Sequence, residues 1–167
     1  MNSEERERLF LELFEQYRER ILRLCRGYLN SPDADDLFQE IMTRVWDNLP
    51  GFRGEARPST WLYRIAVNSA MLYRRKKVPS APLEEIADAG LSPPEEIEKR
   101  ERVAALRQAI ATLREQDRLI ASLLLEGLSY KEIAEITGIT VNYVGVKVTR
   151  IKQALETSLR EFGYGKV

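Results

Sequence analysis

Apolar residues recur at steps of three and four in every long stretch of this chain, and this spacing restricts the fold more than any other feature. The first such stripe comprises Phe10, Leu13, Phe14, Tyr17, Ile21, Leu24 and Tyr28. Because an α-helix turns once every 3.6 residues, this spacing puts the side chains on one helical face. No stretch requires the two-residue alternation of a β-strand, so the sequence predicts an all-α protein.

Two more helices are expected before residue 78. The first carries a stripe of Leu37, Ile41, Val45 and Leu49. Ser31 followed by Pro32 is a typical N-cap and first-turn pair, so we predict that this helix begins there. The segment "LPGFRGEARPS" contains two glycines and two prolines, which indicates a loop. A third helix is predicted from about Thr60 to the "RRKK" sequence.

The character of the chain changes between residues 78 and 94. This segment contains four prolines and shows no sustained apolar periodicity, a composition that favours a flexible connector. We therefore predict two small helical domains, at residues 1–77 and 96–167, joined by a flexible acidic linker at residues 78–95. The second domain opens with an amphipathic stripe of Ile97, Val103, Leu106, Ile110 and Leu113.

The C-terminal part has the signals of a helix-turn-helix. Ser129 and Glu132 have the spacing of a capping box at a helix start, and Gly138 permits a tight turn. Thr140 then caps a second helix whose inward stripe is Val144, Val148, Ile151 and Leu155. Caps, glycine and stripes agree, so we predict a helix-turn-helix here.

Several functional classes lack the residues they need. The 167 residues include no histidine and a single cysteine, Cys25, so an internal disulfide and a Cys/His zinc site are excluded. Cys25 lies among apolar neighbours and is predicted to be an inert core thiol. Phosphate-binding and dinucleotide-binding glycine motifs are missing, so we expect no enzymatic activity, no cofactor and no metal. The charged N-terminus and the lack of a 20-residue apolar run predict a cytoplasmic protein without membrane insertion.

The balanced total of 26 basic and 26 acidic residues conceals a strongly uneven distribution. Residues 51–77 contain seven Arg and Lys but one acidic residue, interleaved with Phe52, Trp61, Tyr63 and Tyr73. Rings that stack on unpaired bases, combined with cations that hold phosphates, are typical of single-stranded nucleic-acid binding. Taken separately, the cations would suit a helix C-terminus and the rings would suit a core.

The predicted second helix of the helix-turn-helix would present a different surface opposite its inward stripe. This surface comprises Asn142, Tyr143, Val146, Lys147 and Arg150. Asn pairs with adenine, Arg and Lys bind guanine or phosphate, and Val or Tyr contacts a thymine methyl. These residues predict duplex reading in the major groove, and the alternative is a helix-turn-helix used only for protein packing.

Three stretches together resemble the bacterial RNA polymerase sigma factors of the extracytoplasmic-function (ECF) class. "DADDLFQEIMTRVW" resembles the region-two helix that binds the polymerase, and "FRGEARPSTWLYRIAVNSA" resembles the loop and helix that capture a flipped base of the melted minus-ten element. "GLSYKEIAEITGITVNYVGVKVTRIKQAL" resembles the region-four helix-turn-helix that reads the minus-thirty-five element. The likeness extends from about Leu9 to Leu155.

The resemblance implies roles for three sets of residues. The polymerase-binding set is Asp33, Asp35, Asp36, Gln39 and Glu40. The minus-ten set is Phe52, Arg53, Glu55, Ala56, Arg57, Ser59, Thr60, Trp61, Arg64, Asn68, Arg74 and Arg75. The minus-thirty-five set is Ser129, Thr140, Asn142, Tyr143, Val146, Lys147 and Arg150.

The resemblance implies a sigma factor that binds core RNA polymerase, directs it to promoters and helps to open promoter DNA. The implied partners are core polymerase, promoter DNA as duplex and as melted single strand, and an anti-sigma factor. One alternative is a helix-turn-helix regulator that acts without being a polymerase subunit, and this alternative predicts palindromic sites. A second is a helical interaction module without a DNA role, which leaves the basic aromatic segment unexplained.

Overall fold

The computed structural model describes residues 1–77 and 93–164, and within these ranges the chain is helical without a β-strand. The prediction of an all-α fold is confirmed. The elements are α1 (Ser3–Leu29), α2 (Ala34–Asn48), the short 3-10 helix η1 (Leu49–Gly51), α3 (Pro58–Lys76), α4 (Pro94–Ala111), α5 (Glu115–Leu125), α6 (Tyr130–Thr137) and α7 (Val141–Glu161). Most of the predicted linker, residues 78–92, lies outside the described residues.

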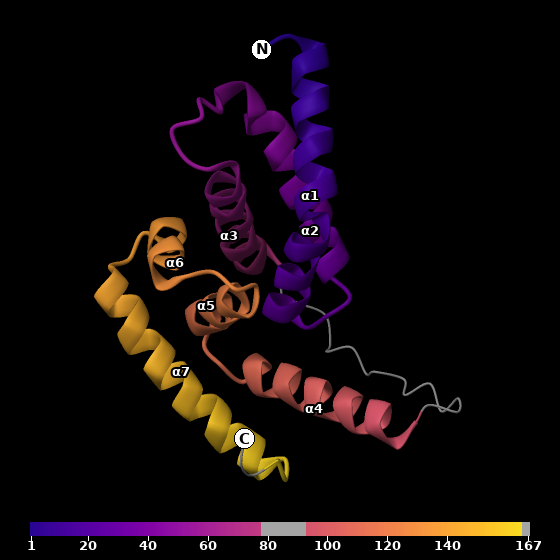
Figure 1. Ribbon diagram of the computed structural model, residues 1–167, viewed down its shortest axis with the longest axis vertical. Coiled ribbons are helices and arrows are strands. Elements are labelled where there is room, and N and C mark those ends of the chain that lie inside the picture. Colours follow the sequence, from indigo (N-terminus) through magenta and orange to yellow (C-terminus); the bar gives the residue numbers. More distant parts are fainter. Residues whose placement is uncertain (78–92, 165–167) are drawn as a thin grey trace.

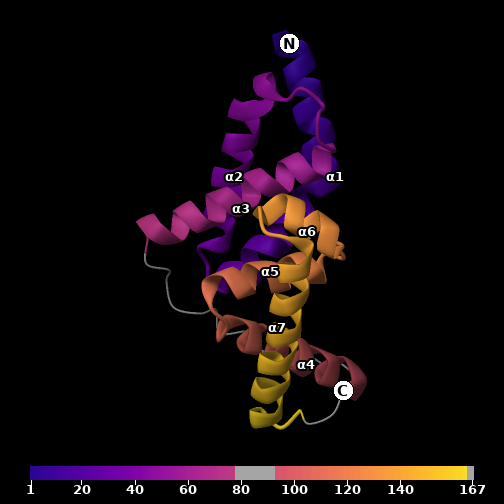
Figure 2. The ribbon, with the colours of Figure 1, turned by 90° about the vertical axis from the view of Figure 1, so that its left-hand side faces the viewer.

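The helices form two groups that also touch each other. In the N-terminal half (residues 1–77), α1, α2 and α3 pack against one another; in the C-terminal half (residues 93–164), α7 contacts α4, α5 and α6. Figure 1 shows α5 and α6 between the N-terminal helices and the long helices α4 and α7. The two halves meet where α5 and α4 contact α1 and where α6 contacts α3. Figure 2, from the side, also places α6 beside α3.

The apolar stripes form the core as the periodicity predicts. In α1 the side chains of Leu13, Ile21, Leu24 and Tyr28 are buried, and Phe10, Phe14 and Tyr17 pack at the edge of the core. The predicted stripe of the second helix, Leu37, Ile41, Val45 and Leu49, is entirely buried. The main cluster of buried apolar residues runs through both halves, because Leu119, Ile120 and Leu123 of α5 belong to it together with residues of α1.

Cys25 lies in this core with 1% of its surface exposed. Burial raises the pKa of its thiol to about 12, because the charged thiolate would lose its hydration. The thiol therefore stays protonated near neutral pH, which agrees with the prediction of an unreactive core cysteine.

Three predictions about helix ends and faces need correction. Ser31 does not cap α2: it is buried in the preceding turn, its hydroxyl accepts from the Asp33 backbone N–H, and the helix begins at Ala34. The third helix starts at Pro58, whose fixed φ suits a first helical turn. In α4, which starts at Pro94, Ile97 and Val103 are exposed by 46% and 43%, so the predicted inward stripe fails there.

Candidate nucleic-acid and polymerase interface

The acidic residues of α2 lie on an accessible helical surface. Asp35, Asp36 and Gln39 are exposed, while Asp33 and Glu40 are half-buried. The spacing of Asp36, Gln39 and Glu40 puts them on one face of the helix. Asp35 and Asp36 also lie in the first turn, where the helix dipole favours negative charge.

These carboxylates have internal partners that a macromolecule could displace. Asp36 lies 3.3 Å from the Lys77 ammonium, Asp35 lies 3.9 Å from Arg26, and Glu40 pairs with Arg44 one turn away at 3.0 Å. Ion pairs at or near the protein surface contribute little to stability, because water screens them. The acidic face of α2 can therefore exchange these partners for a basic surface at low energetic cost.

The predicted base-capturing loop precedes α3 and includes a close aromatic pair. The rings of Phe52 and Trp61 have centroids 4.9 Å apart and planes inclined by 46°, and both side chains are half-buried. Gly54 adopts a φ of 72°, a conformation that other residues rarely adopt. The charged loop residues are exposed, namely Arg53, Glu55 and Arg57, whereas Ala56 and Ser59 are half-buried and Thr60 is buried.

Along α3, the predicted DNA-contacting residues divide between two faces. Trp61, Arg64, Asn68 and Arg75 follow helical spacing along one face, and the last three are exposed. Arg74 instead lies half-buried on the side toward α1, with its guanidinium 6.0 Å from the centre of the Tyr28 ring. We refer to Trp61, Arg64, Asn68 and Arg75 as the α3 face.

The helix-turn-helix has the local structure that the sequence predicts. Ser129 and Glu132 form a reciprocal capping box at α6, Gly138 ends this helix with a φ of 75°, and Thr140 accepts from the Tyr143 backbone N–H at the start of α7. The hydrogen bonds from Ser129 hold the pKa of the Glu132 carboxyl below its usual value. The inward residues of α7, Val144, Val148 and Ile151, are buried.

The opposite side of α7 presents Asn142, Tyr143, Val146 and Arg150 to solvent, and we refer to these four as the α7 face. Lys147 differs from them, because its ammonium lies 2.8 Å from the Asp117 carboxylate and its side chain is only 14% exposed. The hydroxyls of Ser129 and Thr140 serve as caps, so these two residues have a structural role whatever else they contact.

The sequence reasoning missed a set of polar residues where the two halves meet. Arg20 and Arg23 of α1 contact Glu126 at the end of α5, and Tyr28 donates a hydrogen bond to Glu115. Arg64 donates from Nε to the carbonyl oxygen of Glu135 at 3.0 Å. The sequence offers only a weak signal for Glu126: the helix dipole disfavours an acidic residue at a helix C-terminus, so an acid at that position stands out.

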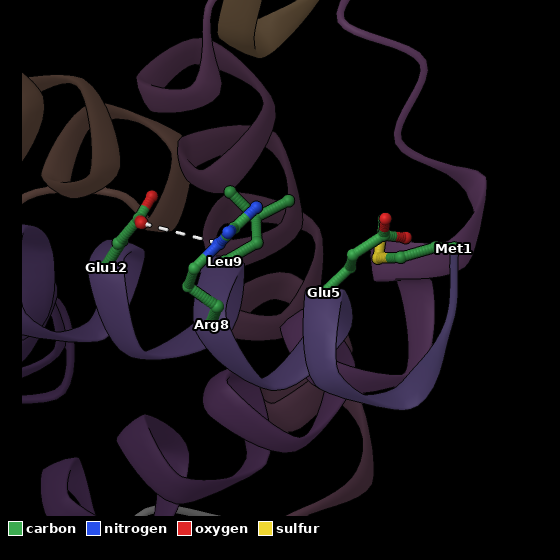
Figure 3. Close-up of a pocket in the computed structure, with 5 residues that line it drawn as sticks. All are labelled: Met1, Glu5, Arg8, Leu9 and Glu12. Carbon is green, nitrogen blue, oxygen red and sulfur yellow. Dashed lines mark ion pairs between the residues drawn. The ribbon is translucent and has the colours of Figure 1, made fainter.

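Other surfaces offer little for chemistry. A hollow near the start of α1 is lined by Met1, Glu5, Arg8, Leu9 and Glu12, all from one end of the chain, as Figure 3 shows. Among the described residues, no three His, Cys, Asp or Glu side chains gather as metal ligands would. None of the helices in residues 1–77 and 93–164 has the length and apolar character needed to cross a bilayer.

Comparison with known proteins relates both halves to one family. The sigma-70 region 2 family matches residues 13–78, and the sigma-70 region 4 family matches residues 104–155. The ECF RNA polymerase sigma factor SigW of Bacillus subtilis is 30% identical over 91% of this chain and 89% of its own length. The ECF RNA polymerase sigma-E factor of Escherichia coli is 30% identical over 92% of this chain and 88% of its own length.

Two solved structures share the fold. CnrH in complex with the cytosolic domain of CnrY aligns with a TM-score of 0.70 over 93% of this chain and 90% of that one, at 20% identity. The sigma factor RpoE of Bartonella quintana, bound to the anti-sigma factor NepR, aligns with a TM-score of 0.71 over 90% of this chain and 96% of that one, at 18% identity. With region 2 and region 4 matched in order and relatives matched over nine-tenths of the chain, this protein belongs to the ECF sigma factors of RNA polymerase.

Proposed function

We propose that this sigma factor binds core polymerase through the acidic face of α2, captures melted minus-ten DNA with the α3 face and the preceding loop, and reads the minus-thirty-five element with the α7 face. The observation that carries this proposal is the match of region 2 and region 4 in one chain, with both predicted DNA faces on exposed helical surfaces. The helix-turn-helix alone would equally suit a conventional regulator. The region 2 match favours a polymerase subunit.

Docking on polymerase would use the negative charge of α2, and the positive charge of the neighbouring helix α3 would remain available for DNA. Asp35 and Asp36 offer carboxylates whose present partners are the exposed cations Arg26 and Lys77, and Glu40 pairs with the half-buried Arg44. A basic polymerase surface would replace those cations, and complementary charge orients such an encounter more than it adds affinity. The basic α3 face would then be turned toward DNA.

Strand opening would draw on binding energy, since we propose that this chain catalyses no reaction and hydrolyses no nucleotide. Unstacking a base costs a few kcal/mol, and one stack on an aromatic side chain returns about 1–3 kcal/mol. A base captured beside Phe52 and Trp61 therefore roughly offsets its own extrusion. Contacts that polymerase and the α7 face make with the promoter must supply the rest of the free energy of strand opening. We propose that the protein acts in the cytoplasm, where bacterial promoters lie.

We also propose an anti-sigma factor as a regulatory partner. The support is that the sigma factor RpoE of Bartonella quintana, which shares the fold, was solved in complex with the anti-sigma factor NepR. Such a protein would compete with polymerase or DNA for the surfaces described above.

Run-off transcription with purified core polymerase on a promoter library tests the proposal. Substituting Asp36→Lys together with Glu40→Lys should abolish polymerase binding, because two attractive contacts become repulsive. The matched control is Asp47→Lys on the same helix, whose carboxylate is 66% exposed and was not assigned to the interface. Equal binding by the double variant and the control, or no initiation on any template, would contradict the proposal.

A further inference from the structure

The end of α2 lacks a hydrogen bond that a helix would normally make. In an α-helix the backbone carbonyl of Trp46 would accept from the N–H of the residue four positions later, which here is Pro50. Proline has no backbone N–H, so this bond cannot form. The preceding N–H, that of Leu49, is bonded to the Val45 carbonyl. The Trp46 carbonyl therefore needs a donor from outside its own helix.

Arg6 of α1 supplies this donor. Its Nε and Nη2 atoms donate to the Trp46 carbonyl oxygen at 3.1 and 2.7 Å. Its guanidinium also lies 4.1 Å from the centre of the Trp46 ring, so one side chain holds both the backbone and the ring of the same residue. The last turn of α2 contains no basic residue, and Arg6 also brings a cation to the negative end of this helix.

The start of α1 is ordered in a way that fixes Arg6. Asn2 and Glu5 form a reciprocal capping box, and the Arg6 N–H donates to the Asn2 carbonyl at 3.1 Å. Phe10, one turn further along α1, meets the Trp46 ring edge-on, with centroids 5.4 Å apart and planes inclined by 88°. Residues four apart share a helical face, so Arg6 and Phe10 together hold the end of α2.

Trp46 lies shortly before the loop that is predicted to capture a base. The short helix η1 follows α2 directly, its Leu49 side chain is buried, and the Phe52 N–H donates to the Leu49 carbonyl at 3.0 Å. α1 also contacts η1, and Figure 1 shows this end of α2 beside the start of α1. The path from Trp46 to Phe52 is short and held at both ends, so a shift of Trp46 would move the ring that pairs with Trp61.

We propose that Arg6 is a positioning residue for strand opening: by holding Trp46 it fixes the end of α2, and thereby the place of the Phe52 ring in the base-capturing loop. This inference rests on the proposed function for the role of that loop. Arg6 acts through Trp46 rather than on a base, and it belongs to none of the sets assigned to polymerase or DNA.

Fluorine NMR of the free protein tests the positioning. The chain contains two tryptophans, so incorporated fluorotryptophan gives one resonance at the end of α2, from Trp46, and one beside the loop, from Trp61. Arg6→Ala should shift the Trp46 resonance directly and the Trp61 resonance through the loop. Arg8→Ala is the matched control, since this arginine of the same helix is 75% exposed and pairs with Glu12. A Trp61 resonance that stays in place in Arg6→Ala would overturn the proposal.

Promoter opening with core polymerase tests the consequence. Arg6→Ala should slow open-complex formation on duplex promoters by about tenfold, because a small misplacement of a positioned group is costly. Polymerase binding and transcription from pre-melted templates should stay within about twofold of the parent, as expected for sites without a shared contact. A general loss of the fold would lower all three readouts together, and that outcome would contradict a positioning role.

Two further variants separate the hydrogen bond from the bulk of the side chain. Arg6→Lys keeps the charge and a donor but lacks the planar fork, so it should recover part of the opening rate. Pro50→Ala restores a backbone N–H four residues after Trp46, so Arg6→Ala should slow opening less in this background than in the parent. An equal loss in both backgrounds would contradict the role assigned to the Trp46 carbonyl.

Failure of the proposed function would look different from failure of this inference. A parent protein that initiates on no promoter would refute the proposed function, while the fluorine spectra would still decide whether Arg6 positions the loop, because they need neither polymerase nor DNA. Opening at the parent rate by Arg6→Ala, despite a shifted Trp61 resonance, would overturn the role of Arg6 in strand opening.

Discussion

The α3 face and the α7 face are both predicted to contact DNA, but they present different chemistry. The α3 face contains two exposed arginines and is followed by Lys76 and Lys77, which are exposed. The α7 face is mostly neutral, because Lys147 is turned into an ion pair with Asp117 and only Arg150 contributes an exposed cation to it. A lysine counted in the sequence of a helix therefore adds no positive charge to its ligand-facing surface when a neighbouring helix supplies a carboxylate partner.

This difference predicts separate modes of binding. Contacts of the α3 face should be dominated by phosphates, which makes them sensitive to salt. Contacts of the α7 face should depend more on Asn142 and the apolar side chains against base edges.

The largest effect is expected at the aromatic pair. Phe52→Ala or Trp61→Ala should slow the opening of duplex promoters by about 5- to 150-fold, the equivalent of one lost base stack. Open-complex formation measured on duplex promoters, beside transcription from pre-melted templates, checks this. Equal defects on both templates would exclude a role in strand opening.

A smaller effect is expected on the salt dependence of promoter binding by the holoenzyme. Arg53→Ala in the loop before α3, together with Arg75→Ala on the α3 face, should reduce the slope of log K against log salt by about 2, whereas Arg150→Ala on the α7 face should reduce it by about 1 at most. Binding titrations at several salt concentrations measure the slopes. Arg18→Ala, an exposed arginine of α1, is the control and should leave the slope unchanged. A larger change from Arg150→Ala than from the pair would reverse the comparison.

The ion pair of Lys147 gives a third prediction. Asp117→Asn should free the Lys147 ammonium for phosphate and tighten holoenzyme binding to duplexes that carry the minus-thirty-five element by about two- to fivefold. Fluorescence anisotropy with labelled duplex measures this. The control is Asp47→Asn, which removes an exposed carboxylate from the other half. Unchanged affinity, with an unaltered thermal unfolding midpoint, would show that Lys147 has no access to DNA.

The smallest effect concerns the stability of α7. Gly145→Ala should stabilise the protein by up to about 1 kcal/mol, because alanine is the better helix former and its Cβ would meet Tyr130 at an ordinary 3.9 Å. Gly138→Ala should destabilise it by about 1 kcal/mol, since φ at this position is 75°. Thermal unfolding of both variants measures the opposite signs. Destabilisation by Gly145→Ala would imply that α7 needs its glycine for close approach.

The local sequence signals predicted much of the structure. The stripe of Leu37, Ile41, Val45 and Leu49 is buried, Ser129 and Thr140 cap the helices they were expected to cap, and Gly138 lies in the predicted tight turn as the C-cap of α6. These features depend on neighbours within four residues, so periodicity and cap chemistry are sufficient to find them. The prediction was wrong for Ile97 and Val103, because their exposure depends on whether another helix covers that end of α4.

The helices, the helix-turn-helix and the family of this protein can all be predicted from its sequence, since they follow from short-range patterns of residues. Three contacts arise only when the helices pack: the Glu126 side chain is buried between two arginines of α1, Lys147 pairs with Asp117, and Arg64 bonds to α6. The arginines lie 106 and 103 residues from Glu126. Contacts across such separations depend on which surfaces meet when the helices pack, and no local pattern of residues encodes that.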